Sequence, residues 1–147
     1  MTVLRMAMSF LAALGFAIVL NAPRKELICC GLCGLVSFAP YLLLRNIISP
    51  TLAIFISTVI AMCFARICSY RRKAPSTTYV IMGILPHVPG AGMYYTMYGI
   101  LNSDMTFAFI KGIETLKTAG VIAMGVILVF LLPGELFTVR LREEKQQ

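Results

Sequence analysis

Residues 27–65 read LICCGLCGLVSFAPYLLLRNIISPTLAIFISTVIAMCFA, and Arg45 carries the only charge among them. A helix needs about 20 residues to cross a hydrocarbon core of ~30 Å, so this stretch is long enough for two crossings. Arg45 and Asn46 divide it into spans 27–44 and 47–65. Neither span alternates between apolar and polar residues as the strands of a membrane barrel do. The stretch therefore predicts two transmembrane helices joined by a short turn.

The composition of the whole chain points the same way. Hydrophobic residues make up 59% of the 147 residues and charged residues 13%, and the mean hydropathy is +0.87. Soluble domains average about 45–50% apolar and about 25% charged residues. A soluble globule of this length cannot bury so many apolar side chains, because most of its surface must stay hydrated. The composition therefore excludes a soluble globular protein.

Three further apolar stretches flank the two spans, at residues 3–20, 79–101 and 116–134. The first has the look of a signal peptide, but Leu20-Asn21-Ala22 is a poor cleavage site, and we treat it as a retained helix. Residues 111–118 predict an amphipathic lead-in at the membrane interface, in which Glu114 is a solvated i,i+3 partner of Lys111. We expect an all-α, single-domain bundle of five transmembrane helices over residues 1–147, with a cytoplasmic basic tail at 138–147.

The net charge of +7 comes from basic residues at the ends of the apolar stretches. There they act as topology signals and lipid anchors, and no nucleic-acid-binding motif accompanies them. With five spans, one side receives nine basic residues and the other four. The first group is Arg24, Lys25, Arg66, Arg71, Arg72, Lys73, Arg140, Arg142 and Lys145, and the second is Arg5, Arg45, Lys111 and Lys117. The positive-inside rule places the N-terminus outside and the C-terminus in the cytoplasm. If the fourth stretch entered and left the membrane on the same side, the basic residues would divide eight to five between the two sides. This difference still leaves a re-entrant fourth stretch as an alternative.

Small residues within the spans predict close helix packing. Cys30 and Cys33 form a C-x-x-C inside an apolar run, and we interpret them as packing residues because no second ligand pair accompanies them. A stripe of small side chains recurs every four residues in the third stretch, at Ala53, Ser57, Ala61 and Ala65. Such a stripe lets two helices approach closely in lipid, and we prefer packing within the chain to contact with a partner.

The fourth stretch is interrupted near its middle. Pro86 and Pro89 are followed by Gly90 and Gly92. Each proline removes a backbone donor and clashes with the preceding turn, and glycine does not rigidify the chain. We therefore expect two half-helices joined by an unwound segment at Pro86–Gly90, in the middle of the membrane.

An unwound segment at that depth must be buried in protein or line a wet cavity. The second half-helix would point free N–H groups and its positive end from Gly90 into that cavity, where a carboxylate binds well. His87 is a candidate carrier of a coupling proton; the alternative is a neutral histidine bonded to a freed carbonyl. Tyr94 is a candidate donor to a substrate, although tyrosines also gather at membrane interfaces. No nucleophile–base set, metal cluster or cofactor motif is present, so we expect neither an enzyme nor a cofactor.

Three segments of this chain resemble the threonine/serine exporter family: GFAIVLNAP at 15–23, the glycine-rich opening of the second helix, and LPHVPG at 85–90. The chain is most similar to the small five-helix component of the family's two-chain form. The residues that match the family pattern are Asn21, Pro23, Pro86, Pro89 and Gly90. Residues 37–40 depart from the more polar, basic stretch of some relatives, which bears on the substrate.

The resemblance implies a bacterial cell-membrane exporter of threonine and serine, or of a dicarboxylate such as succinate. It also implies a larger partner subunit with five helices, related to this chain as an inverted repeat. Our hypothesis is a proton-coupled exporter subunit, and the alternative is a non-transporting scaffold that stabilises a partner. The candidate transport residues are Asn21, Pro23, Pro86, His87, Pro89, Gly90, Gly92 and Tyr94.

Overall fold

The computed structural model describes residues 2–134, which form helices and turns without any strand. The predicted all-α class is confirmed over these residues, and the predicted tail at 138–147 lies outside them. The helices are α1 (Thr2–Val19), η1 (Arg24–Glu26), α2 (Leu27–Leu44), α3 (Pro50–Arg72), α4 (Ser76–Ile84), η2 (Leu85–His87), α5 (Gly90–Leu101) and α6 (Met105–Leu131).

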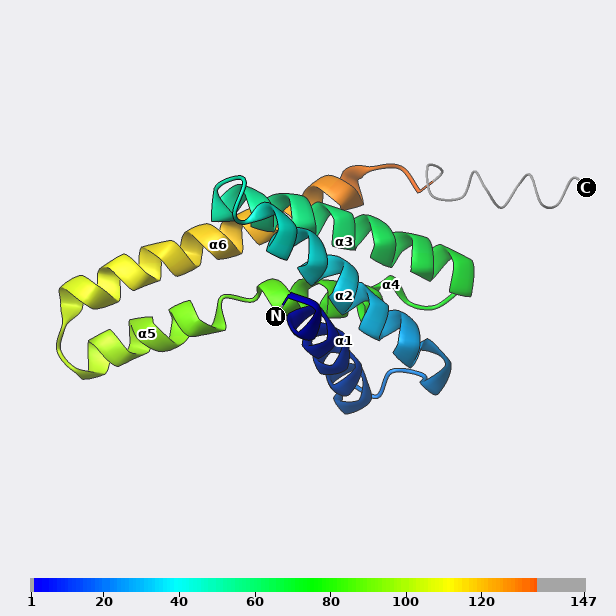
Figure 1. Ribbon diagram of the computed structural model, residues 1–147, viewed down its shortest axis with the longest axis horizontal. Coiled ribbons are helices and arrows are strands. Elements are labelled where there is room, and N and C mark those ends of the chain that lie inside the picture. Colours follow the sequence, from blue (N-terminus) through cyan, green and yellow to red (C-terminus); the bar gives the residue numbers. More distant parts are fainter. Residues whose placement is uncertain (1, 135–147) are drawn as a thin grey trace, which may run out of the picture.

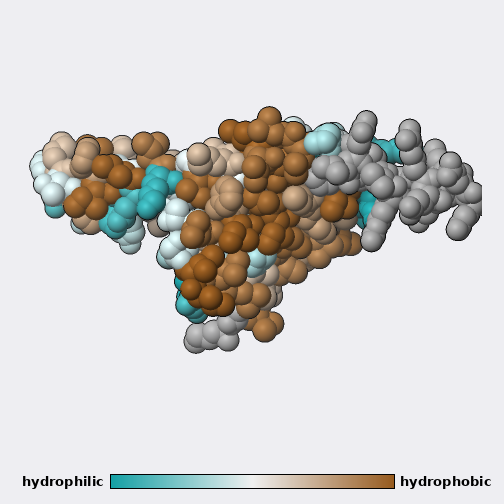
Figure 2. Space-filling model, turned by 90° about the horizontal axis from the view of Figure 1, so that it is seen from above, coloured by the Kyte–Doolittle hydropathy of each residue, from teal (hydrophilic) through white to brown (hydrophobic). Residues whose placement is uncertain are grey.

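The helices form a bundle from which a two-helix arm projects (Figure 1). Helices α1 to α4 pack on one another, and α3 also packs on α6. Helix α5 packs on α6 and makes no comparable contact with any other described helix. We call α5 together with residues 105–116 of α6 the arm. The surface of the bundle is largely hydrophobic, and a band of hydrophilic residues crosses the arm (Figure 2).

Three helical segments are long and apolar enough to cross a membrane: Arg24–Leu44, Pro50–Arg72 and Met105–Leu131. Helix α1 is apolar but shorter, and the fourth apolar stretch is divided between α4, with 9 residues, and α5, with 12 residues. The chain is therefore a multi-pass membrane protein by its helices. The count of five spans stays a prediction.

Helix α3 begins later and ends later than the predicted span 47–65. It begins at Pro50 because Ser49 caps it, accepting a hydrogen bond from the amide of Leu52 at 3.5 Å. It continues past Arg66, whose buried guanidinium donates to the carbonyls of Val129 at 2.6 Å and of Leu132. These carbonyls lie at the C-terminal end of α6, where a cation is favourable. The sequence suggested that the helix ends before Arg66, but Arg66 lies inside α3, which continues to Arg72.

Helix α6 also differs from its prediction. The expected amphipathic lead-in and the last span form one continuous helix of 27 residues. Within it, Lys111 Nζ pairs with Glu114 Oε2 at 2.8 Å, as the i,i+3 spacing predicted. The helix ends at Leu131 and not at residue 134, because Leu132 precedes Pro133 and is extended.

The stripe of small residues on α3 lies in the core. Ala53, Ser57, Ala61 and Ala65 are completely buried within the chain. A side chain at Gly83 of α4 would meet Ala61, which shows how closely α4 approaches this stripe. The preference for packing within the chain is confirmed. The cysteines have the predicted packing role as well: Cys29, Cys30, Cys33 and Cys68 are buried in one cluster of the core.

Candidate transport site

The polypeptide leaves the helical conformation between η2 and α5. Helix α4 ends at Ile84, a single 3₁₀ turn follows, and Val88 and Pro89 lie outside any helix, with ψ angles of 123° and 55°. Val88 is not helical, and its position before Pro89 agrees with this because the helical region is disfavoured for a residue before proline. Helix α5 has no side-chain cap, and the amides of Ala91 and Gly92 have no hydrogen-bond partner within residues 2–134. The start of α5 is thus open to an external acceptor.

His87 lies at this break and is buried, with 6% of its surface exposed. Its Nε2 atom is 3.0 Å from the Oγ atom of Ser57 on α3, and its ring meets the ring of Tyr41 on α2 edge-on. The Ser57 Oγ atom also lies 3.0 Å from the carbonyl oxygen of Ile54. Whether Ser57 or His87 donates in their contact depends on the tautomer of the imidazole, and in either case the contact fixes the ring against α3.

The break is also held from α2. Ser37, which is buried, donates to the carbonyl of Gly83 at 2.5 Å, at the C-terminal end of α4. The sequence placed Ser57 in the stripe of small residues and indicated no contact of Ser37 or Ser57 with the break. Since both hydroxyls contact the broken segment, α2 and α3 fix its position from two sides.

Pro86 lines a groove of about 600 Å³ between α1 and the end of α4. The other lining residues are Leu4, Arg5, Met8, Ser9, Ala12, Ala13, Phe16, Phe38 and Leu85. Arg5 is the one charged residue among them, and sequence analysis treated it only as a charge at the end of a span. The groove combines an apolar wall with one cation, a lining that suits a small amphipathic anion.

The remaining predicted site residues after the break do not present their Cα positions or side chains to one common surface. Gly90 is exposed, and a side chain there would meet no atom within 4 Å. Gly92 instead lies against Thr115 of α6, where a side chain would clash. Tyr94 is 64% exposed and packs against Tyr95 and Tyr98 on the arm. Gly92 and Tyr94 therefore belong to the arm, and their assignment to a substrate site stays a prediction.

Asn21 and Pro23 form the turn after α1. Asn21 has a φ of 54°, a left-handed conformation that asparagine tolerates at the end of a helix. The amide of Ala22 bonds to the carbonyl of Ala17 and closes this turn, and Pro23 leads into η1. Neither Asn21 nor Pro23 lines the groove. The local contacts of both residues are those of a helix-ending turn.

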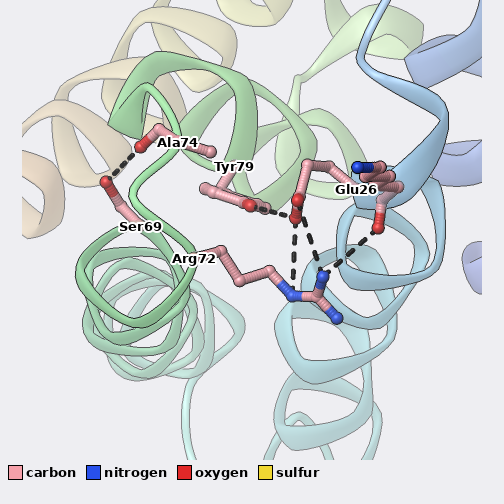
Figure 3. Close-up of polar contacts among 6 residues, drawn as sticks. Glu26, Ser69, Arg72, Ala74 and Tyr79 are labelled. Carbon is pink, nitrogen blue, oxygen red and sulfur yellow. Dashed lines mark hydrogen bonds and ion pairs between the residues drawn. The ribbon is translucent and has the colours of Figure 1, made fainter.

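A second polar cluster joins η1, α3 and α4 (Figure 3). Buried Glu26 accepts a hydrogen bond from the hydroxyl of Tyr79 at 2.5 Å, and its Oε2 atom is 3.4 Å from Nε of Arg72. Arg72 also donates to the carbonyl of Lys25. The cluster was not predicted from the sequence, because Glu26 is 46 residues from Arg72 and 53 residues from Tyr79, and the three residues belong to different elements. The cluster fixes the start of α4, the helix that leads to the break.

We expect Tyr79→Phe to destabilise the chain by about 1–3 kcal/mol, because it leaves a buried carboxylate oxygen without its hydroxyl donor. Thermal unfolding of the purified chain in detergent, followed by helical circular dichroism, measures the change. Tyr98→Phe is the matched control, since Tyr98 is exposed and its hydroxyl donates to no described residue. Equal unfolding temperatures for the two variants would show that the cluster contributes nothing to stability.

Apolar helices, a helix interrupted beside a buried histidine and a groove at that interruption define a multi-pass membrane protein with a candidate transport site. The family model described as "Threonine/Serine exporter, ThrE" matches residues 5–132, and the chain belongs to this family. A threonine/serine exporter of Corynebacterium glutamicum is 31% identical over 130 residues, which are 88% of this chain and 26% of that protein. The chain thus spans about a quarter of the length of this relative. No solved structure matches the chain significantly.

The predicted family is therefore confirmed. It is a family of bacterial membrane transporters and not a class of enzymes, which also agrees with the sequence analysis. The family match includes both the break at Val88–Pro89 and the arm, so both features lie within the family's shared domain.

Proposed function

We propose that the chain is a subunit of an exporter for small carboxylate-bearing metabolites, either amino acids of the threonine and serine type or a dicarboxylate such as succinate. It works with a larger membrane subunit and is driven by the proton gradient. It lies in the bacterial cell membrane with its N-terminus outside and its C-terminus in the cytoplasm.

The interruption of the helix at Val88–Pro89 is the observation that carries the proposal. In a membrane, free backbone groups at such a break need a protein or aqueous partner. The amides of Ala91 and Gly92 are free within the described chain, and the positive end of α5 favours a carboxylate there. Arg5 on the neighbouring groove adds a charge of the same sign. These features favour an anionic group on the substrate.

His87 is the proposed carrier of the coupling proton. Its Nε2 atom contacts Ser57, and the gain or loss of a ring proton changes the charge of the imidazole at the break. A positive charge on a buried side chain is costly unless an anion or water approaches it. Binding of a carboxylate substrate at the break would lower that cost, which couples the substrate to the proton.

The proposed partner follows from the resemblance of the chain to the small five-helix component of a two-chain exporter. About three quarters of the Corynebacterium glutamicum exporter has no counterpart in this sequence. In transporters built from inverted repeats, the substrate site lies between two matching halves. We infer that a larger subunit supplies the second half of the site.

The proposed orientation follows from the position of the basic residues. Arg72 contacts the carbonyl of Lys25, so the end of α3 and the turn before α2 lie at the same end of the bundle. Arg24, Lys25, Arg71, Arg72 and Lys73 all belong to these two segments. The positive-inside rule favours the cytoplasm for this end.

A non-transporting scaffold is the second candidate. Its contact surface would be the stripe of small residues on α3, but Ala61 of that stripe is completely buried within the chain. A scaffold would therefore have to use another surface, and it would give no reason for the free amides at the break. We prefer the exporter for this reason.

Deletion of the chain tests the proposed function. We expect cells that lack it to retain threonine, serine or succinate, and a plasmid copy to restore export. Intracellular and extracellular concentrations of the three metabolites are measured after loading the cells. Unchanged export of all three would contradict the proposed substrates, whatever the fold of the chain.

A further inference from the structure

Residues 76–87 form a short helical unit between two non-helical joints. The unit consists of α4 and η2, and we call it the lever. Before it, residues 73–75 lie outside any helix, and Lys73 has a φ of 54°, a left-handed conformation. After it, Val88 and Pro89 also lie outside any helix. The lever is therefore connected to α3 and to α5 only through turns, and neither neighbouring helix continues into it.

Polar side chains hold the lever near both of its ends. Near its start, the hydroxyl of Tyr79 donates to buried Glu26 of η1 at 2.5 Å (Figure 3). Near its end, Ser37 of α2 donates to the carbonyl of Gly83, and His87 contacts α3. The position of the lever thus depends on a few side-chain contacts and not on the backbone hydrogen bonds of a longer helix.

The middle of the lever meets a smooth part of α3. Gly83 lies against Ala61 and Met62, and a Cβ atom at Gly83 would be 2.9 Å from the Cε atom of Met62. Met62 and Met82 are both completely buried at this level. Methionine is unbranched and flexible, so it adapts to a changed contact more easily than a branched or aromatic side chain does. This contact therefore lets the lever shift along α3 without a rigid interlock.

The two ends of the lever face opposite ends of the bundle. Tyr79 lies beside Glu26, at the end that the proposed orientation places in the cytoplasm. Seven residues further on, about 10 Å along a helix, Pro86 lines the groove that contains Arg5 at the start of α1. An exporter must admit its substrate from the cytoplasm, so a route to the break has to open at the Tyr79 end. In the structure this end is closed, because Tyr79 and Glu26 are both buried.

We propose that the lever moves as a unit during export and that the bond between Tyr79 and Glu26 is the latch that keeps its cytoplasmic end closed. The inference rests on the proposed function, which gives the direction of transport. The latch is accessible to water from one side, since the side chain of Arg72 beside Glu26 is 44% exposed. When Tyr79 is released, the joints at 73–75 and 88–89 absorb the change in backbone angles, as hinges of a few residues do. The movement exposes the break to the cytoplasm.

Two cysteines of the chain report on the latch. Cys29 and Cys68 belong to the same buried cluster as Tyr79 and are each 9% exposed, so opening of the latch makes them accessible. Membranes that contain the chain and the larger family member are treated with N-ethylmaleimide, and labelling of each cysteine is followed by mass spectrometry. We expect the exported metabolite among threonine, serine and succinate to accelerate this labelling by about three-fold or more, because turnover populates the open position. Cys63 on α3 lies outside the cluster and is the internal control.

Tyr79→Phe provides the second measurement, with exposed Tyr98→Phe as its matched control. Loss of the hydrogen bond is expected to accelerate labelling of Cys29 and Cys68 by about ten-fold without any metabolite, because the open position is then populated more often. A purely structural role of Tyr79 would also accelerate labelling in this variant. It would not make the labelling of the wild-type chain depend on a metabolite.

Export of the same metabolites is measured alongside, which separates the possible failures. If a metabolite is exported but leaves the labelling of wild-type Cys29 and Cys68 unchanged, the latch is wrong while the exporter function stands. Equal acceleration at Cys63 would show that the whole chain loosens, which also overturns the latch. If none of the three metabolites is exported, the proposed function is wrong and the latch fails with it.

Discussion

His87→Ala is expected to lower export by about ten-fold or more at equal amounts of protein in the membrane, which corresponds to an increase of about 1.4 kcal/mol or more in the transport barrier. The physical reason is that His87 is the single histidine of the sequence and lies buried at the break, so no other imidazole can take its place. Removing it leaves the free amides of α5 but no group that exchanges a proton there. Export of labelled threonine, serine and succinate is measured and divided by the membrane abundance of the chain.

Ser57→Ala is the matched control for His87→Ala. It removes the hydroxyl that contacts His87 but keeps the imidazole, and a small side chain is retained in the stripe on α3. We expect Ser57→Ala to lower export per molecule much less than His87→Ala, because the group that carries the proton is still present. If His87→Ala behaves in the same way, His87 has a structural role only and the proposed proton carrier is wrong.

Gly99→Ala is expected to destabilise the chain by about 1–3 kcal/mol, the usual cost of overpacking. The new Cβ atom would be 2.8 Å from the Ala108 amide nitrogen and 3.0 Å from its Cα atom, and backbone atoms cannot turn aside as a side chain can. The two helices of the arm must therefore separate. The midpoint of thermal unfolding of the purified chain in detergent gives the change.

Gly120→Ala is the control for Gly99→Ala, because it is expected to leave the stability unchanged or to increase it. A Cβ atom at Gly120 meets no atom within 4 Å, and alanine is favoured over glycine in a helix by about 1 kcal/mol. We expect this variant to be as stable as the wild type or more stable. A stabilised Gly99→Ala would show that the close contact in the arm does not exist in the protein.

The helices could be predicted from the sequence because lipid imposes long apolar stretches, whose ends are marked by charge, proline and asparagine. The ends of a helix were predicted wrongly where a polar side chain inside it bonds to a residue distant in the sequence. Arg66 is the clearest case, since its charge is stabilised by carbonyls at the end of α6, 63 and 66 residues away. Similarly, the charges at Lys111 and Glu114 pair with each other and do not interrupt α6.

The candidate site could be predicted only in part. The prolines and glycines at 86–90 indicate locally that a continuous α-helix is unfavourable there. The unwound part is shorter than the predicted Pro86–Gly90, because only Val88 and Pro89 lie outside any helix. The partners of His87 come from α2 and α3, and nothing local in the sequence indicates that Tyr41 and Ser57 meet it. Tyr94 and Gly92 were assigned to the site because they follow the break, whereas the structure places them on an arm whose direction depends on α6.

Counterflow in proteoliposomes tests the central claim most directly. The chain is purified with the larger family member and reconstituted into vesicles loaded with unlabelled threonine, serine or succinate, and uptake of the labelled metabolite is followed. We predict uptake for at least one of the three, dependent on the presence of both subunits and abolished or strongly slowed by His87→Ala. Uptake that is equally fast without this chain would contradict the account, because the broken helix at Val88–Pro89 would then take no part in transport.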